Sequence, residues 1–318
     1  MNLISIHLIL LPFSGVINLA YIVLLYIPLL RTKISTKNFY VLAPITLIAL
    51  INFYINQSII IYFITIYLCL TDTSKVKLPN TRFLHLVIIL SIIVALIPSG
   101  SFFRFTFPGL EQNFTALSIF VIWFCTRSKL NVIALFFLSL TVSRAAIFSA
   151  FGIIIARTIQ KILIRHYWTL LLIVFVSFIL SNIYILQIQN LASYRNDFSR
   201  MYTIFDTSNY HRALANIYFL EAMLKHSLYL GHDANEIRSY VDFGAARFVH
   251  NTFLQLCYLY SPLFAIIYYL IILKELSKTS AGCVVGPFFF AYSMILHSVL
   301  NPVYMILIIL YCRASDRV

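Results

Sequence analysis

Charged residues are scarce in this sequence. Asp, Glu, Lys and Arg together make up 10% of its 318 residues, whereas 61% of the residues are hydrophobic. Soluble domains carry about 25% charged residues, and a water-soluble fold of this length could not bury so much apolar surface. The composition therefore predicts a protein whose main solvent is lipid.

Motifs of familiar soluble enzymes are also missing. The sequence contains no GxxxxGK[ST], HExxH or GxSxG element. Its five cysteines all lie in or beside apolar runs, without metal-ligand spacing. No residue near His226 and His232 completes a zinc site, and no closely spaced Asp pair lies in a polar segment. We therefore expect no metal ion and no cofactor.

The formal net charge of +13 does not indicate a nucleic-acid partner. Lys and Arg stand singly or in threes between apolar runs. That distribution is typical of membrane-topology signals rather than of a nucleic-acid-binding face.

Long apolar runs cover most of the chain. They occupy about 3–30, 38–70, 83–98, 114–126, 130–156, 167–186, 252–273 and 281–312. A helical crossing needs about 20 residues, so runs 38–70 and 281–312 are each long enough for two crossings. Breaks are expected between Asn56 and Ser58 and at Asn301-Pro302.

The other runs complete the fold prediction. Run 3–30 fits either one tilted helix or a short pair that turns between Pro12 and Gly15, and run 252–273 is expected to be one crossing. The predicted fold class is all-α: a polytopic transmembrane helical bundle of about 10–12 crossings, built as a single membrane domain over residues 1–318.

The distribution of Lys and Arg predicts the orientation of this bundle. Short connections that carry Lys or Arg stay in the cytoplasm, whereas long loops cross the membrane regardless of their charge. One topology places every short basic connection inside. It leaves the large polar loop, residues 187–251, on the non-cytoplasmic side.

Run 130–156 is flanked by basic residues on both sides, so it must cross an even number of times. It is expected to turn back near Thr141-Val142-Ser143-Arg144, with arms of about 13 residues or about 20 Å of helix. These arms are shorter than the roughly 30 Å hydrocarbon core, so the apex should lie in a water-filled pocket. The alternative is one long helix with a snorkelling Arg144.

The 187–251 loop is expected to contain an amphipathic helix from Tyr210 to Leu228. Glu221 and Lys225 form a favourable i,i+4 pair on it. We expect its apolar face to lie on the membrane surface as a lid over the pocket. That face comprises Ala213, Ile217, Leu220, Leu224 and Leu228.

Three arginines are predicted on this side of the membrane: Arg144 at the hairpin apex, and Arg212 and Arg247 in the loop. Arginine presents a rigid fork that suits phosphate oxygens. Several arginines converging on one pocket would bind a pyrophosphate and stabilise it as a leaving group. Solvated positions on a helix or at the interface are the alternative for Arg212 and Arg247.

His250 precedes the next apolar run, within Phe248-Val249-His250-Asn251-Thr252. A neutral imidazole there would accept a proton from a hydroxyl nucleophile, and a capping or interfacial role is the alternative. Asn251 is interpreted as an N-cap or as a residue that supports the site. Ser143 is expected to support Arg144 in the same way.

These elements resemble the bacterial O-antigen polymerase and O-antigen ligase superfamily. The resemblance covers about residues 100–318 and rests on TVSRAA from Thr141, on His211-Arg212, on HSLYLGHD from His226 and on HNTFL from His250. A weaker similarity is RFTFPGLEQN from Arg104. Each motif alone is unspecific, and their order, spacing and shared membrane side carry the resemblance.

The resemblance implies a metal-independent, inverting glycosyl transfer at the periplasmic face of a bacterial inner membrane. The donor would be an oligosaccharide on undecaprenyl pyrophosphate. Arg144, Arg212 and Arg247 would bind its pyrophosphate, and His250 would deprotonate the acceptor hydroxyl, with Arg212 beside it in catalysis.

Three functions remain open from the sequence. The favoured one is an O-antigen polymerase, whose acceptor is another lipid-linked repeat unit and whose partners include membrane lipids and a chain-length regulator. An O-antigen ligase would use lipid A–core as its acceptor. A transporter or flippase for the same lipid-linked sugars is the non-enzymatic alternative, but it predicts two similar halves, and the sequence has no internal repeat.

Overall fold

The computed structural model describes residues 3–13, 36–53, 59–71, 112–125, 158–191, 207–225, 251–295 and 299–316, with single positions between 89 and 110 and between 151 and 155. Within these residues all regular structure is helical, which confirms the all-α class for this part of the chain. The helices are α1 (Leu3–Leu10), the 3-10 helix η1 (Leu11–Phe13), α3 (Thr36–Phe53), α4 (Ile59–Leu70), α6 (Gln112–Cys125), α9 (Gln160–Arg165), α10 (Tyr167–Leu191), α11 (Thr207–Lys225), α13 (Thr252–Leu259), α14 (Pro262–Leu276), α15 (Ser280–Ile295) and α16 (Pro302–Ser315).

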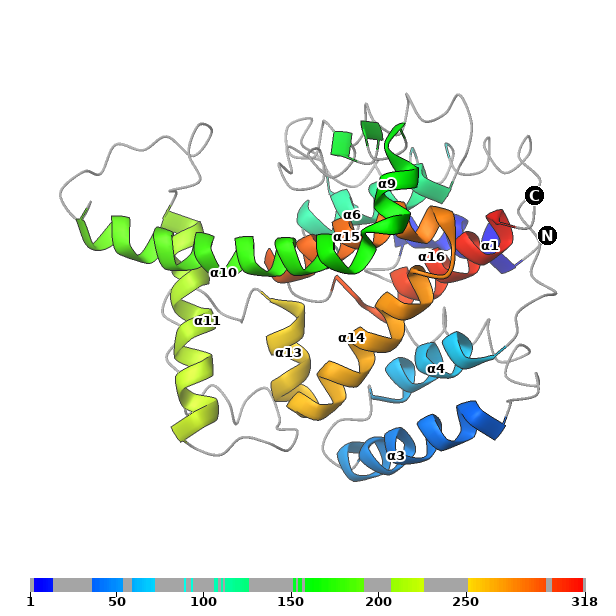
Figure 1. The fold of residues 1–318 in the computed structure, drawn as a ribbon, viewed down its shortest axis with the longest axis horizontal. Coiled ribbons are helices and arrows are strands. Elements are labelled where there is room, and N and C mark those ends of the chain that lie inside the picture. Colours follow the sequence, from blue (N-terminus) through cyan, green and yellow to red (C-terminus); the bar gives the residue numbers. More distant parts are fainter. Residues whose placement is uncertain are drawn as a thin grey trace.

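α16 lies at the centre of the bundle (Figure 1) and contacts α1, α4, α6, α14 and α15. Nearly all of its side chains are buried, as expected of a helix that is apolar all round. Asn301 caps its N-terminus by accepting a hydrogen bond from Val303 N, and Pro302 occupies the first turn, where its missing N–H costs nothing. The predicted break at Asn301-Pro302 is confirmed.

Helix α6 runs parallel to α16, and helix α4 runs parallel to α14. Ser118 of α6 hydrogen-bonds Tyr304 early in α16, and Phe124 packs against Tyr311 two turns later. On the other side, Tyr62 of α4 packs against Phe264 at the start of α14. Further along, the end of α4 meets the end of α16 through Arg313. The C-terminal ends of these helices therefore lie at one end of the bundle.

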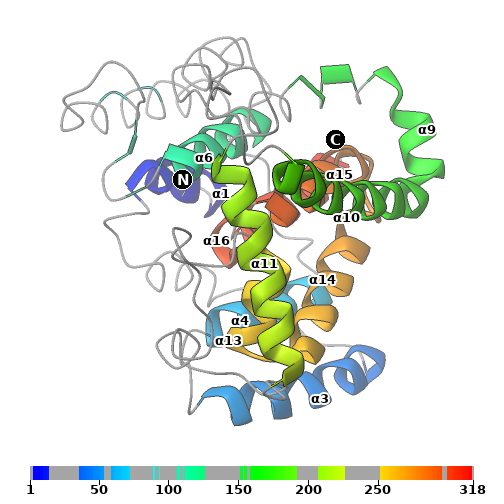
Figure 2. The same cartoon turned by 90° about the vertical axis from the view of Figure 1, so that its left-hand side faces the viewer.

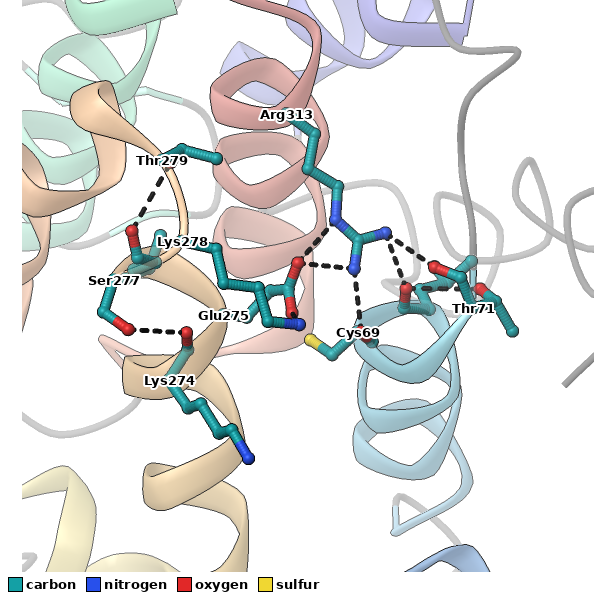
Figure 3. A network of polar contacts seen from close by, with 10 residues as sticks. Cys69, Thr71, Lys274, Glu275, Ser277, Lys278, Thr279 and Arg313 are labelled. Carbon is teal, nitrogen blue, oxygen red and sulfur yellow. Dashed lines mark hydrogen bonds and ion pairs between the residues drawn. The ribbon is translucent and has the colours of Figure 1, made fainter. Parts of the chain in front are cut away.

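Helix ends that the sequence assigns to the cytoplasm are joined directly at this end (Figure 3). The Arg313 guanidinium donates to Glu275 of α14 and to the carbonyl oxygens of Leu68, Cys69 and Thr71 at the end of α4. Asp316 accepts hydrogen bonds from Ser280 at the start of α15. We call Arg313, Glu275 and the α4 carbonyls the basic-end clamp.

α10 is the one described helix that is long and apolar enough to cross a membrane. Only 11% of its Tyr167–Tyr184 stretch is buried, although Leu172, Ile173 and Leu180 are large and apolar. A core helix of a soluble protein would hide such side chains, so this surface suits contact with lipid. The other apolar helices among the described residues, α4, α6, α15 and α16, are shorter than a full span.

Residues 252–276 form a helical hairpin rather than the single crossing expected from the sequence. α13 ends at Leu259, and α14 starts at Pro262 after Ser261, which has a φ of 151°. Phe253, eight residues before Ser261, packs edge-on against Tyr269, eight residues after it. The chain therefore reverses at Ser261. Pro262 causes the break because it cannot donate the helical hydrogen bond and restricts the residue before it.

Candidate functional site

Two of the six predicted site residues, Arg212 and Asn251, lie in the part of the chain that the structure describes. Ser143, Arg144, Arg247 and His250 fall outside the described residues, and so does the predicted hairpin in run 130–156, apart from a few positions near its end. The structure can therefore place the helix that carries Arg212 and the segment that follows His250.

Asn251 is the N-cap of α13, as one of the sequence interpretations proposed. Its side-chain oxygen accepts a hydrogen bond from Leu254 N at 3.1 Å. Its amide nitrogen donates to the carbonyl oxygen of Met294, at the end of α15, at 3.2 Å. Since Asn251 is only 3% exposed, both contacts are shielded from solvent. They fix the point at which the chain leaves residue 250 and enters α13.

Thr252 ties the start of α13 to the start of α16. Its hydroxyl oxygen accepts a hydrogen bond from Val299 N at 3.0 Å. The carbonyl oxygen of Leu300, the residue after Val299, accepts a hydrogen bond from the Tyr268 hydroxyl at 2.7 Å. The N-termini of α13 and α16 are thus held together beside the end of α15. Helix N-termini carry partial positive charge, so this junction favours negative charge nearby.

The junction is recessed relative to the hairpin tip. Phe253 is level with Tyr269, which stands midway along α14. α13 has 8 residues, so its N-terminus lies about 12 Å from the tip at Ser261. The tip lies at the end of α14 opposite the basic-end clamp. The start of α13 therefore lies deeper along the bundle than the tip, whereas the pocket predicted at the Arg144 apex falls outside the described residues.

Arg212 lies in the second turn of α11 and is half-buried. Its helix face also carries Ala215, Asn216 and Phe219, which are buried. This position does not agree with a fully solvated arginine at the start of the helix. α11 packs against α10 and α13 and lies crosswise to α10 at the end of the bundle away from the clamp (Figures 1 and 2).

α11 packs on the bundle through a face beside the apolar stripe that the sequence predicts to lie on the membrane surface. Leu220 and Leu224 belong to that stripe, but they are 40% and 68% exposed. The helix instead packs through Phe219 and small residues on either side of it. The predicted pair of Glu221 and Lys225 is confirmed, with 3.6 Å between carboxylate and ammonium. Contact of this stripe with the membrane surface stays a prediction.

One aromatic contact sets the register between α11 and α13. The rings of Phe219 and Tyr258 meet edge-on, with centroids 5.5 Å apart. Arg212 stands seven residues before Phe219, and Asn251 stands seven residues before Tyr258. Seven residues are close to two helical turns, and both helices run in the same direction (Figure 1). Arg212 and Asn251 therefore lie at the same level, on faces that the aromatic pair brings together.

Two buried polar residues, one on α11 and one on α14, were missed by sequence reasoning. Asn216 is buried, and its side-chain oxygen has no hydrogen-bond partner among the described residues. Tyr269 is also buried; the hydroxyls of Ser293 and Thr252 are its polar neighbours, but neither meets hydrogen-bond geometry with it. The available signal for Asn216 was its i+4 spacing from Arg212. Tyr269 gave no signal, because its place depends on the hairpin.

The described part of this arrangement has the chemistry of an anion site. The described residues contain no group of three His, Cys, Asp or Glu side chains close enough to hold a metal ion. They do combine a half-buried arginine with two helix N-termini at one level.

Comparison with known proteins gave no match to a family model, to a curated protein or to a solved structure.

Proposed function

We propose that this chain is a multi-pass inner-membrane glycosyltransferase that polymerises a surface polysaccharide such as O-antigen. Its donor is an oligosaccharide on undecaprenyl pyrophosphate, and its acceptor is a second lipid-linked repeat unit. The site opens on the periplasmic face. No metal ion takes part, because the guanidinium groups supply the charge that stabilises the leaving pyrophosphate.

The observation that carries this proposal is the shared level of Arg212 and Asn251. The Phe219–Tyr258 contact brings the arginine of the loop helix to the same level as the residue that follows His250. A pyrophosphate-binding group and a general base must lie within one substrate length of each other. The shared level of Arg212 and the start of α13 supports this arrangement, although the two are about 40 residues apart in the sequence.

The proposed reaction needs one base and one anion site. His250 removes the proton from an acceptor hydroxyl as its oxygen attacks the anomeric carbon of the donor. The bond from that carbon to the pyrophosphate oxygen breaks, and the configuration inverts. Arg144, Arg212 and Arg247 hold the undecaprenyl pyrophosphate as it leaves with the bonding electron pair. Pyrophosphate is already a good leaving group, so no general acid is required.

Support for the membrane topology comes from the two ends of the bundle. The clamp joins helix ends whose flanking residues include Lys274, Lys278 and Arg313, as the positive-inside rule requires of a cytoplasmic end. α11 lies at the other end, crosswise to the exposed apolar surface of α10. That position suits a helix at the periplasmic membrane surface.

The test is complementation of a deletion strain, with the lipopolysaccharide resolved on a gel. The wild-type chain should restore a ladder of repeats. Arg212→Ala and His250→Ala should leave core capped with a single repeat, because the donor is no longer held or the acceptor no longer deprotonated. Lys225→Ala is the matched control on the same helix, since the Lys225 side chain is 70% exposed, and it should restore the ladder.

Other band patterns would lead to different conclusions. A full ladder from both Arg212→Ala and His250→Ala, at wild-type protein levels, would refute catalysis by these residues and favour transport or a structural role. A deletion strain whose core carries no repeat at all would assign the acceptor as lipid A–core and the protein as a ligase.

A further inference from the structure

The short helix α9 exposes most of its surface. None of its residues is buried, and Leu163 is the side chain that packs against the core. The helix ends at His166, after which α10 begins in a new direction, so that α9 stands crosswise to α10 (Figures 1 and 2). The remaining side chains of α9 are therefore available for contact with something outside the bundle.

The start of α10 places α9 beside the basic-end clamp. The Tyr167 hydroxyl donates a hydrogen bond to the carbonyl oxygen of Leu273 at 3.2 Å. Leu273 lies in the last turn of α14, two residues before Glu275 of the clamp. Because Tyr167 follows α9 directly after the cap residue, α9 stands near this end of the bundle. The sequence predicts that this end lies at the cytoplasmic membrane surface.

Two cations share one side of α9. Lys161 and Arg165 stand four residues apart, both side chains are exposed, and neither forms an ion pair with a described acidic residue. The sequence has no Asp or Glu between positions 112 and 196. The described acids make their contacts elsewhere, on Lys225, on the clamp and on Ser280: Glu221, Glu275 and Asp316. The described part of the chain thus leaves the positive charge of α9 uncompensated.

Apolar side chains stand next to these cations. Ile162 follows Lys161 and is 59% exposed, and Ile164 precedes Arg165 and is 45% exposed. Trp168, in the first turn of α10, is 50% exposed. Such a mixture is unfavourable in bulk water, whereas Trp is enriched at membrane–water interfaces. Lys and Arg in that position extend their charged ends to the head-group layer while their stems stay in apolar surroundings.

We propose that α9 and the start of α10 bind an anionic phospholipid at the membrane surface beside the clamp. The lipid phosphate accepts hydrogen bonds from Lys161 and Arg165, and the upper part of the acyl chains covers Ile162 and Trp168. One amphiphile thus satisfies both the charge and the apolar surface. A zwitterionic lipid offers the same phosphate but brings its own cation, so a lipid with net negative charge binds more tightly.

The test uses the two tryptophans of the chain as reporters. The purified full-length chain is reconstituted into phosphatidylcholine vesicles in which a minor fraction of the lipid is brominated near the head group. The brominated lipid is either phosphatidylglycerol or phosphatidylcholine. Bromine quenches tryptophan fluorescence at short range, so quenching reports which lipid lies beside Trp168. Trp123 is 2% exposed inside the bundle, and Trp168→Phe gives its signal as background.

Brominated phosphatidylglycerol should quench Trp168 of the wild-type chain more than the same fraction of brominated phosphatidylcholine. One Lys or Arg near an anionic lipid surface strengthens association about fivefold. Lys161→Gln and Arg165→Gln should each lower the preference by about this factor, and the double variant should show none. Lys161→Arg keeps the charge and should keep the preference. Lys225→Gln removes the same charge from α11, where the side chain is 70% exposed, and should change nothing.

Equal quenching of the wild-type chain by the two brominated lipids would overturn the inference. A preference that survives in the Lys161→Gln, Arg165→Gln double variant would overturn it too, as would an equal loss in Lys225→Gln, which would reduce the effect to net charge. Absence of quenching by either lipid would show that Trp168 does not face lipid. Added salt should weaken the wild-type preference, which tests the charge contribution without any substitution. None of these outcomes depends on the glycosyltransferase proposal.

Discussion

The basic-end clamp gives the sharpest stability prediction. Arg313 is 13% exposed and Glu275 is 5% exposed, and the guanidinium donates to the Glu275 carboxylate at 2.6 Å from Nε. Three further hydrogen bonds of 2.7 to 3.0 Å go to carbonyl oxygens at the end of α4. These are carbonyls that a helix C-terminus leaves without partners in its own backbone. Arg313 therefore both neutralises Glu275 and caps α4 (Figure 3).

Arg313→Met should destabilise the chain by about 3–5 kcal/mol, because breaking a buried ion pair leaves an uncompensated charge. Lys278 keeps a contact to Glu275 at 2.6 Å, but its side chain is 56% exposed and replaces only part of the lost interaction. Arg313→Lys should fall in between, since one ammonium cannot reach all four acceptors. In the double variant Arg313→Met, Glu275→Leu the loss should be smaller, because no buried charge is left unpaired.

The measurement is unfolding of the purified chain in micelles titrated with SDS and followed by circular dichroism. The four proteins of the double-mutant cycle give the coupling energy between the two side chains. Lys274→Met, at an exposed position one residue before Glu275, is the control and should change stability by less than about 0.5 kcal/mol. An Arg313→Met variant within about 1 kcal/mol of wild type would refute the clamp.

Three further changes test the rest of the structure. Asn251→Ala should cost about 1–2 kcal/mol, because it removes the cap on Leu254 N and the bond to Met294 O, whereas Asn251→Asp should keep the cap; equal losses in the same SDS titration would contradict this. Gly286→Ala should cost about 1–3 kcal/mol, because its Cβ would overlap the Tyr167 hydroxyl where α10 meets α15; Tyr167→Leu should recover part of the loss. Leu224→Cys should react with an impermeant maleimide from the periplasm, and Lys274→Cys only after the inner membrane is opened; the five native cysteines are buried and give little background. Labelling of Lys274→Cys in intact cells would reverse the proposed topology.

Hydropathy and charge predicted the helical class and several helix boundaries. The break at Asn301-Pro302 was predictable because Asn is a strong N-cap and Pro is favoured in the first turn. The start of α13 at Asn251 was predictable for the same reason. Capping is a local interaction, so the sequence around the helix start is sufficient to predict it.

The hairpin at Ser261 was not predicted, because both of its arms are apolar and hydropathy averages over them. The local signal was Pro262, which the apolar run concealed. The role of Arg313 was missed for a different reason. A topology signal requires only that Arg313 lie near a cytoplasmic helix end. The clamp also depends on contacts with α4, which is more than 240 residues away in the sequence.

Non-helical backbone lies at the junction of α13, α15 and α16. In hydrocarbon, non-helical backbone is stable only where its polar groups are paired or line a wet cavity. Here side chains supply several of the partners. Thr252 accepts from Val299 N, Tyr268 donates to Leu300 O, and Asn251 donates to Met294 O.

These contacts stabilise the interruption between helices α15 and α16, at the level where α13 begins. The starts of α13 and α16 carry partial positive charge, and Arg212 lies at the same level on α11. Under the proposed function, the pyrophosphate of the donor would bind at this level, near the starts of α13 and α16 and the guanidinium of Arg212.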